Sequence, residues 1–105
     1  VYAQRAQVPL FRSDAALTIT RINVTNSVSD HETAGDLKWA DDIFTGGFAN
    51  ATVIAVCDTT TGVFTATAGF DDATIASGKE VYFQFDSSPH TDIKDIRFEV
   101  WFTYD

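Results

Sequence analysis

The residues that come closest to forming a chemical site are paired aspartates. They stand at Asp41-Asp42, within the short segment 37–45 that ends at Gly46-Gly47, and at Asp71-Asp72, which follow Gly69 at a break. Carboxylate oxygens in loops suit Ca²⁺, which takes about six to eight oxygen ligands. The Asp-x-Asp-x-Asp-Gly spacing of an EF-hand loop does not occur. The pairs therefore predict turns or strand ends first, and a calcium site as the lesser alternative.

Nucleophilic chemistry has little support. Cys57 is the only cysteine, and it ends an apolar run over residues 53–57. A reactive thiolate needs a histidine and an electropositive setting, whereas Asp58 and three threonines follow Cys57. His31 and His90 stand in predicted loops and are too few for a zinc site. Phosphate-binding glycine loops and serine-nucleophile elbows are absent, so the sequence predicts a protein that is not an enzyme.

The charge excludes two classes of partner. Fifteen acidic residues against seven basic ones give the 105-residue chain a net charge of −8. Nucleic-acid binding and adhesion to an anionic membrane both need clustered Lys and Arg, and the basic residues here are scattered. No apolar run approaches the ~18 residues of a membrane-spanning helix. We therefore expect neither nucleic acid nor membrane as a partner.

The hydrophobic pattern predicts an all-β domain. Thr, Val, Ile and Phe dominate, and helical periodicity is missing. Within residues 15–25 the alternation slips at Thr20-Arg21, which predicts a bulge. Turn signals about every 8–12 residues favour two packed antiparallel sheets in a β-sandwich. Strands are predicted over 15–25, 37–45, 51–57 (a central strand covered on both faces), 63–68, 73–78, 80–86 and 95–104.

The first 14 residues predict an extended N-terminal arm, and residues 15–105 a single sandwich domain. Polar residues interrupt the alternation at the start of the chain, and Pro9 has no N–H to give to a sheet. The arm is nevertheless apolar enough to dock on this domain, a preceding domain or a neighbouring subunit. The docking residues are predicted to be Tyr2, Val8, Leu10 and Phe11.

The last strand has the clearest alternation. It turns Ile96, Phe98, Val100, Phe102 and Tyr104 inward, and Arg97, Glu99, Trp101 and Thr103 outward. An outward Trp101 would stack on a sugar ring or fill a subunit interface, and the alternative is that both faces of the strand are covered.

Two further aromatic residues are candidates for the same kind of contact. Trp39 follows Lys38 on its predicted strand, and Tyr82 is predicted to point outward together with Gln84.

Five stretches resemble small β-sandwich domains of phage and prophage virion proteins. They are residues 16–22 (ALTITRI), 35–42 (GDLKWADD), 49–54 (ANATVI), 58–62 (DTTTG) and 78–86 (GKEVYFQFD). Such domains sit at the ends of fibre and spike proteins or decorate capsids. The resemblance implies a jelly-roll-like sandwich with an arm that joins a shaft or a neighbour.

Together, these observations predict a non-enzymatic structural or attachment domain, located in a virion or a similar extracellular assembly. It would self-associate, as a trimer or an array, through its arm and the aromatic face of its last strand. Other virion or assembly proteins and a cell-surface glycan would be further partners. The alternative is a carbohydrate-binding module in which Trp101, Trp39 or Tyr82 stacks on sugar.

Overall fold

A computed structural model of the chain describes residues 7–27, 34–41, 51–58, 62–86 and 95–105. Those residues contain strands and no helix, so none of their segments forms a helix suited to crossing a membrane. The strands are β1 (Gln7–Arg12), β2 (Leu17–Asn26), β3 (Gly35–Ala40), β4 (Thr52–Val56), β5 (Val63–Ala66), β6 (Thr74–Ile75), β7 (Glu80–Phe85) and β8 (Ile96–Tyr104).

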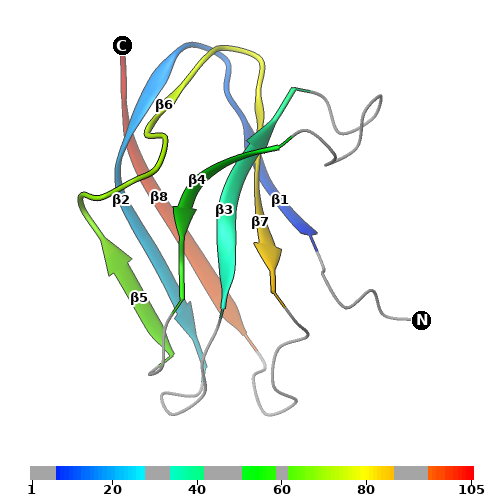
Figure 1. Cartoon of the computed structure of the whole chain (residues 1–105), viewed down its shortest axis with the longest axis vertical. Coiled ribbons are helices and arrows are strands. Elements are labelled where there is room, and N and C mark those ends of the chain that lie inside the picture. Colours follow the sequence, from blue (N-terminus) through cyan, green and yellow to red (C-terminus); the bar gives the residue numbers. More distant parts are fainter. Residues whose placement is uncertain (1–6, 28–33, 42–50, 59–61, 87–94) are drawn as a thin grey trace.

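The strands form two antiparallel four-stranded sheets that pack as a β-sandwich, as the sequence predicts (Figure 1). The first sheet has the order β1-β7-β3-β4. In the second sheet, β2 lies in the middle, with β8 along one side and β5 and β6 sharing the other. This order does not establish the jelly-roll connectivity that the resemblance implies.

The bulge predicted in β2 is confirmed. The pairing of β2 with β8 shifts between Ile19 and Arg21, which leaves Thr20 as the extra residue. An extra residue restores the phase of the pleat. The apolar residues on both sides of the slip therefore face the same core, and all are at most 2% exposed: Leu17, Ile19, Ile22 and Val24.

Aromatic side chains of β7 and β8 join the two sheets. Phe83 of β7 is fully buried, and its ring centroid lies 4.9 Å from that of Phe98 on β8. Phe85 packs edge-on against Phe83 at 5.0 Å and contacts Phe98 at 6.4 Å. Because aromatic side chains bury large apolar areas, this cluster holds the sandwich closed at its centre.

The central strand predicted over residues 51–57 is wrong. β4 is the edge of the first sheet, and Val56 is 53% exposed. The pairing with β3 shifts opposite Ile54, so that Ile54 and Ala55 are both buried. The bulge removes the alternation that would have marked a half-exposed strand. The freed Ile54 carbonyl accepts hydrogen bonds from the backbone N–H groups of Asp71 and Asp72, at 2.8 and 3.3 Å.

Residues 7–12 belong to the sandwich and not to a separate arm. They form β1 at the edge of the first sheet, paired with β7, and Pro9 lies opposite Tyr82. Pro is tolerated there because the other side of an edge strand has no neighbour to receive an N–H. Val8, Leu10 and Phe11 pack against the core of their own domain. Tyr2 lies outside the described residues.

The inward pattern predicted for β8 holds over its first half only. Ile96, Phe98 and Val100 pack against the core, whereas Phe102 is 37% and Tyr104 59% exposed. At that end Phe102 stacks on Phe11 of β1, with ring centroids 5.8 Å apart. β1 and β8 belong to different sheets, so this stacked pair joins the two sheets at that end of the core.

Replacing Phe98 with Ala tests the aromatic closure. Phe98 is half-buried, so we expect a loss of about 2–3 kcal/mol, below the ~3–5 kcal/mol typical of a fully buried Phe. Phe102→Ala on the same strand removes mainly the stacked pair and should cost about 1 kcal/mol. Urea denaturation in dilute solution measures both values. Equal losses for the two variants would contradict the described burial.

Candidate functional site

The most distinctive surface is the C-terminal half of β8. It carries three exposed aromatic side chains, Trp101 (52%) on the outward face of the strand and Phe102 (37%) and Tyr104 (59%) on the inward face, which we call the aromatic edge. Exposed aromatic residues that adjoin one another on a sheet edge are unusual for an isolated soluble domain, because edges invite pairing and apolar patches invite contact.

The outer side of the aromatic edge combines an indole with charges. Trp101 lies opposite Arg21 of β2, whose guanidinium carbon is 5.3 Å from the ring centroid. Farther along β8, Arg97 Nε lies 3.5 Å from Glu99 Oε1. Trp101, Arg97 and Glu99 thus share the outward face, as the alternation predicts. Of the two interpretations of Trp101, the structure supports an exposed residue over a core residue.

The inner side of the aromatic edge seals the sandwich beside β1. Tyr104 packs edge-on against Phe102, with ring centroids 5.4 Å apart. The Tyr104 hydroxyl donates a hydrogen bond to Asp14 Oδ1 at 3.1 Å, and the pKa of Tyr104 is raised by this bond and by the nearby carboxylate. A carboxylate acceptor favours the neutral phenol, so Tyr104 remains a donor over the ordinary pH range.

Tyr82 and Gln84 do not form the exposed platform that the sequence predicts. Tyr82 is fully buried, and burial raises its pKa, so its ring offers no surface to a sugar. Gln84 accepts a hydrogen bond from Lys38 Nζ at 2.9 Å across the first sheet. Tyr82 is not part of the core cluster that contains Val81, Phe83 and Phe85, as the alternation along the strand predicts. Its burial on the other face of the strand depends on the tertiary fold, which the alternation does not report.

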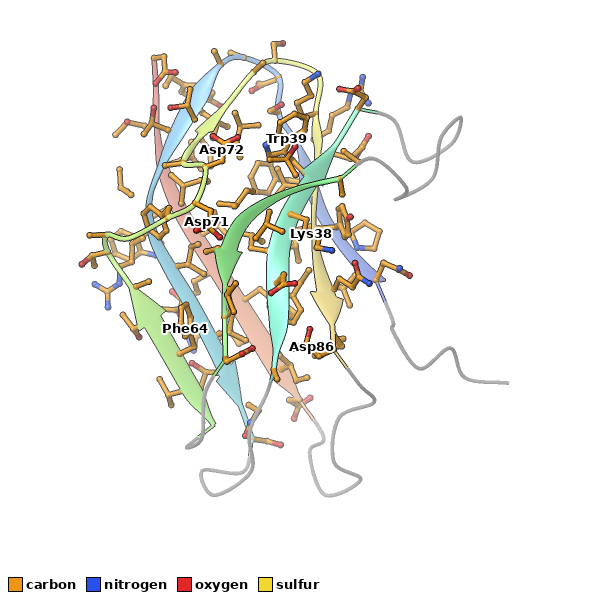
Figure 2. All side chains as sticks on the ribbon, viewed as in Figure 1. Lys38, Trp39, Phe64, Asp71, Asp72 and Asp86 are labelled. Atoms are coloured by element: carbon orange, nitrogen blue, oxygen red, sulfur yellow. The ribbon has the colours of Figure 1, made fainter. Side chains whose placement is uncertain are left out.

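Trp39 forms part of a packed corner and is not an open contact residue. It is half-buried against the core, and its indole Nε1 donates to Asp72 Oδ2 at 3.4 Å (Figure 2). Lys79 Nζ lies 5.2 Å from the centroid of the Trp39 ring and forms an ion pair with Asp41. The corner therefore joins β3 to the segments before and after β6.

The candidate calcium ligands are not gathered. Within the described part of the chain, no three His, Cys, Asp or Glu side chains form a group that could hold a metal ion. Asp41 binds Lys79 and Asp72 binds Trp39, whereas Asp71 uses its backbone N–H to cap the β4 bulge. Asp42 lies outside the described residues.

Cys57 is the buried small residue that its apolar run predicts. It is fully buried directly after β4, and burial raises the pKa of its thiol to about 12. A thiol with that pKa carries almost no thiolate near neutral pH, and the thiolate is the nucleophile. Cys57 is therefore chemically inert in the folded domain.

Asp36 is the acid that sequence analysis missed. It lies in β3 opposite Gln84, and its pKa is raised, first by burial and then by the charge of Asp86, while Lys38 opposes the shift. Figure 2 shows Lys38 on β3 and Asp86 just after the end of the neighbouring strand β7. The alternation of Asp36 and Lys38 in residues 35–39 marks an outward face, but nothing in the sequence indicates that this face is partly buried.

Comparison with protein-family models, with curated proteins and with solved structures finds no match to this chain. Its function must therefore be argued from its own surface.

Asp36→Asn should raise the thermal midpoint at pH 7. The folded pKa of Asp36 lies above the ordinary 3.8, so ionisation destabilises the fold fully above the folded pKa, and this effect disappears as the pH falls below 3.8. The gain of the variant over wild type should accordingly shrink towards zero at pH 3. Asp95→Asn, at an exposed aspartate, controls for the change in net charge. Equal gains for both variants at pH 7 would contradict the assigned cause.

Proposed function

We propose that this chain is a non-enzymatic structural or attachment domain of a virus particle or a similar extracellular assembly, and that it self-associates through the aromatic edge. The observation that carries the proposal is that three aromatic residues are exposed on one edge strand, Trp101, Phe102 and Tyr104. The resemblance to phage and prophage virion domains supports the setting, as a trimer or an array that contacts other virion proteins.

Three physical features favour an interface at β8. Aromatic side chains are enriched among the residues that dominate binding energy at protein interfaces. The chain as a whole carries a charge of −8, which keeps copies apart, but β8 itself contains one Arg and one Glu and is neutral. Finally, Phe11 of the edge strand β1 stacks on Phe102, so the edges of both sheets meet at this side of the sandwich.

The remaining parts of this proposal follow the resemblance. The segment that precedes β1, including Tyr2, would supply a further contact to a neighbouring subunit. A jelly-roll-like connectivity and a location in the virion or outside the cell belong to the same proposal.

Light scattering over a range of protein concentrations tests self-association. We expect the whole chain to form oligomers and Trp101→Ser to dissociate about 30-fold more readily, as for an interface residue worth ~2 kcal/mol. Val56→Ser is the matched control, since Val56 is 53% exposed but lies on β4. A wild-type chain that stays monomeric at the highest concentrations would remove self-association from the proposal.

A carbohydrate-binding module is the second candidate. It is favoured by the exposed indole of Trp101 with Arg97 and Glu99 on the same face, since a flat ring beside polar groups can stack on a sugar and bind its hydroxyls. A glycan array would then show binding that is lost in Trp101→Ala and retained in Trp39→Phe, because Trp39 is packed in its corner. An array that shows no glycan binding would favour the structural or attachment domain over the carbohydrate-binding module.

A further inference from the structure

Among the described residues, one side of the β8 backbone pairs with β2 and the other side has no strand beside it. The backbone N–H and C=O groups of the odd-numbered residues point towards β2. The Asp95 carbonyl accepts from the Ser27 N–H at 3.0 Å, and the Trp101 carbonyl accepts from Thr20 Oγ1 at 3.2 Å. The Asp105 N–H donates to the Ala16 carbonyl at 3.0 Å. Because backbone groups alternate in direction along a strand, the even-numbered residues turn their N–H and C=O groups the other way.

In the part of the chain that the structure describes, β8 pairs with β2 and with no other strand. Residues 96–104 thus present a nine-residue open edge. An open edge of this length is a template for another strand, and proteins normally shorten, charge or cover such edges.

We propose that two copies of this chain pair through β8, antiparallel and related by a two-fold axis, with Trp101 opposite the partner's Trp101. This inference rests on the self-association proposed above. It specifies a two-fold contact, which is compatible with an array of copies and not with a three-fold trimer. The second sheets of the two copies would then join into one continuous sheet, in which the even-numbered residues of β8 exchange backbone hydrogen bonds across the axis.

Side-chain direction limits the possible registers. A continuous sheet keeps the core faces of both copies on one side, so each inward residue must lie opposite an inward residue. Shifting the partner strand by one residue violates this condition and is excluded. Shifting it by two residues satisfies the condition and moves the centre of the pair by one residue. The remaining registers differ in which charged residues lie opposite each other.

Charge then selects among the remaining registers. Centring the pair on Glu99 sets Glu99 against its own copy, and centring it on Phe102 sets Glu99 against the partner's Asp105. Like charges directly opposite each other are destabilising. Centring on Phe98 pairs only residues 96–100 of each strand and leaves the aromatic edge outside the contact.

Only one of these registers avoids the faults. Centring on Val100 sets Asp95 opposite the partner's Asp105, which again opposes like charges. Centring on Trp101 sets Arg97, whose side chain is 74% exposed, opposite the partner's Asp105, and does so twice across the axis. We therefore commit to the register centred on Trp101.

The same register completes both faces of the aromatic edge. On the outer face, the two Trp101 rings meet at the axis, each with Arg21 on its far side. On the inner face, Phe102 lies opposite the partner's Val100, and Tyr104 opposite the partner's Phe98. The exposed Phe102 and Tyr104 rings of one copy would thus pack beside the half-buried Val100 and Phe98 side chains of the other.

Cysteine cross-linking tests the register directly, because Cys57 is buried and unreactive. In the proposed pair, Glu99 lies opposite the partner's Thr103 in a position without backbone hydrogen bonds, where Cα atoms are ~4.5 Å apart, within the range that a disulfide spans. Glu99→Cys and Thr103→Cys proteins, mixed and mildly oxidised, should give a disulfide-linked dimer. Each variant alone should give at most a few per cent of that yield.

The controls separate this inference from the proposed function. Cross-linking of Glu99→Cys alone would indicate the register centred on Glu99 and overturn ours. Oligomers by light scattering without cross-linking in the mixture would overturn the pairing through β8 but leave self-association standing. A monomeric chain would overturn both, and a strand from another protein would then be the better occupant of the edge.

A charge exchange provides a second readout that uses no new cysteine. Asp105→Arg places two Arg residues opposite each other, twice across the axis, and should weaken dimerisation about tenfold, which corresponds to ~1.4 kcal/mol. Adding Arg97→Asp to that variant restores opposite charges and should restore the wild-type dissociation constant. A double variant that is no tighter than Asp105→Arg would contradict the proposed register.

Discussion

The fold depends on one extra residue in the strand that every other strand of its sheet contacts. β2 pairs with β5, β6 and β8, and its apolar residues change phase at Thr20. Without the bulge, Ile22 and Val24 would point to solvent whenever Leu17 and Ile19 pointed to the core. With it, all of β2 faces the core, and Thr20 donates a side-chain hydrogen bond to the Trp101 carbonyl of β8. The bulge thus sets the position of Trp101 relative to the core.

The place of β2 at the centre of its sheet leaves β8 at the edge, and this exposes the aromatic residues. β8 has the most regular alternation of apolar and polar residues in the chain. In the middle of a sheet, all of its inward residues would be buried in the core. At the edge, Phe98 in its first half packs against Phe83 and Phe85, whereas Phe102 in its second half stacks on Phe11 and stays 37% exposed. Acidic residues elsewhere are engaged in local contacts, such as Asp41 with Lys79 and Asp72 with Trp39. The aromatic edge, which contains no charged residue, is therefore where we place the proposed contact with a partner.

Much of the architecture follows from the sequence because it depends on local pattern. The all-β class, the strands over 80–86 and 95–104, the bulge at Thr20 and the buried Cys57 were all predictable from period-two alternation and residue type. Of the site, the outward direction of Trp101, Arg97 and Glu99 was predictable in the same way. Position within a sheet was not, because alternation reports which face of a strand is apolar and says nothing of which strand lies beside it.

The sequence by itself therefore determined which residues form strands and which of their faces is apolar. The tertiary structure alone decided which strands become edges and what covers each outer face. It placed β4 at an edge, drew Gln7–Arg12 into the first sheet, buried Tyr82 and raised the pKa of Asp36. The physical reason is that strand order and burial arise from contacts between segments far apart in the chain, and these depend on how the sheets pack as a whole.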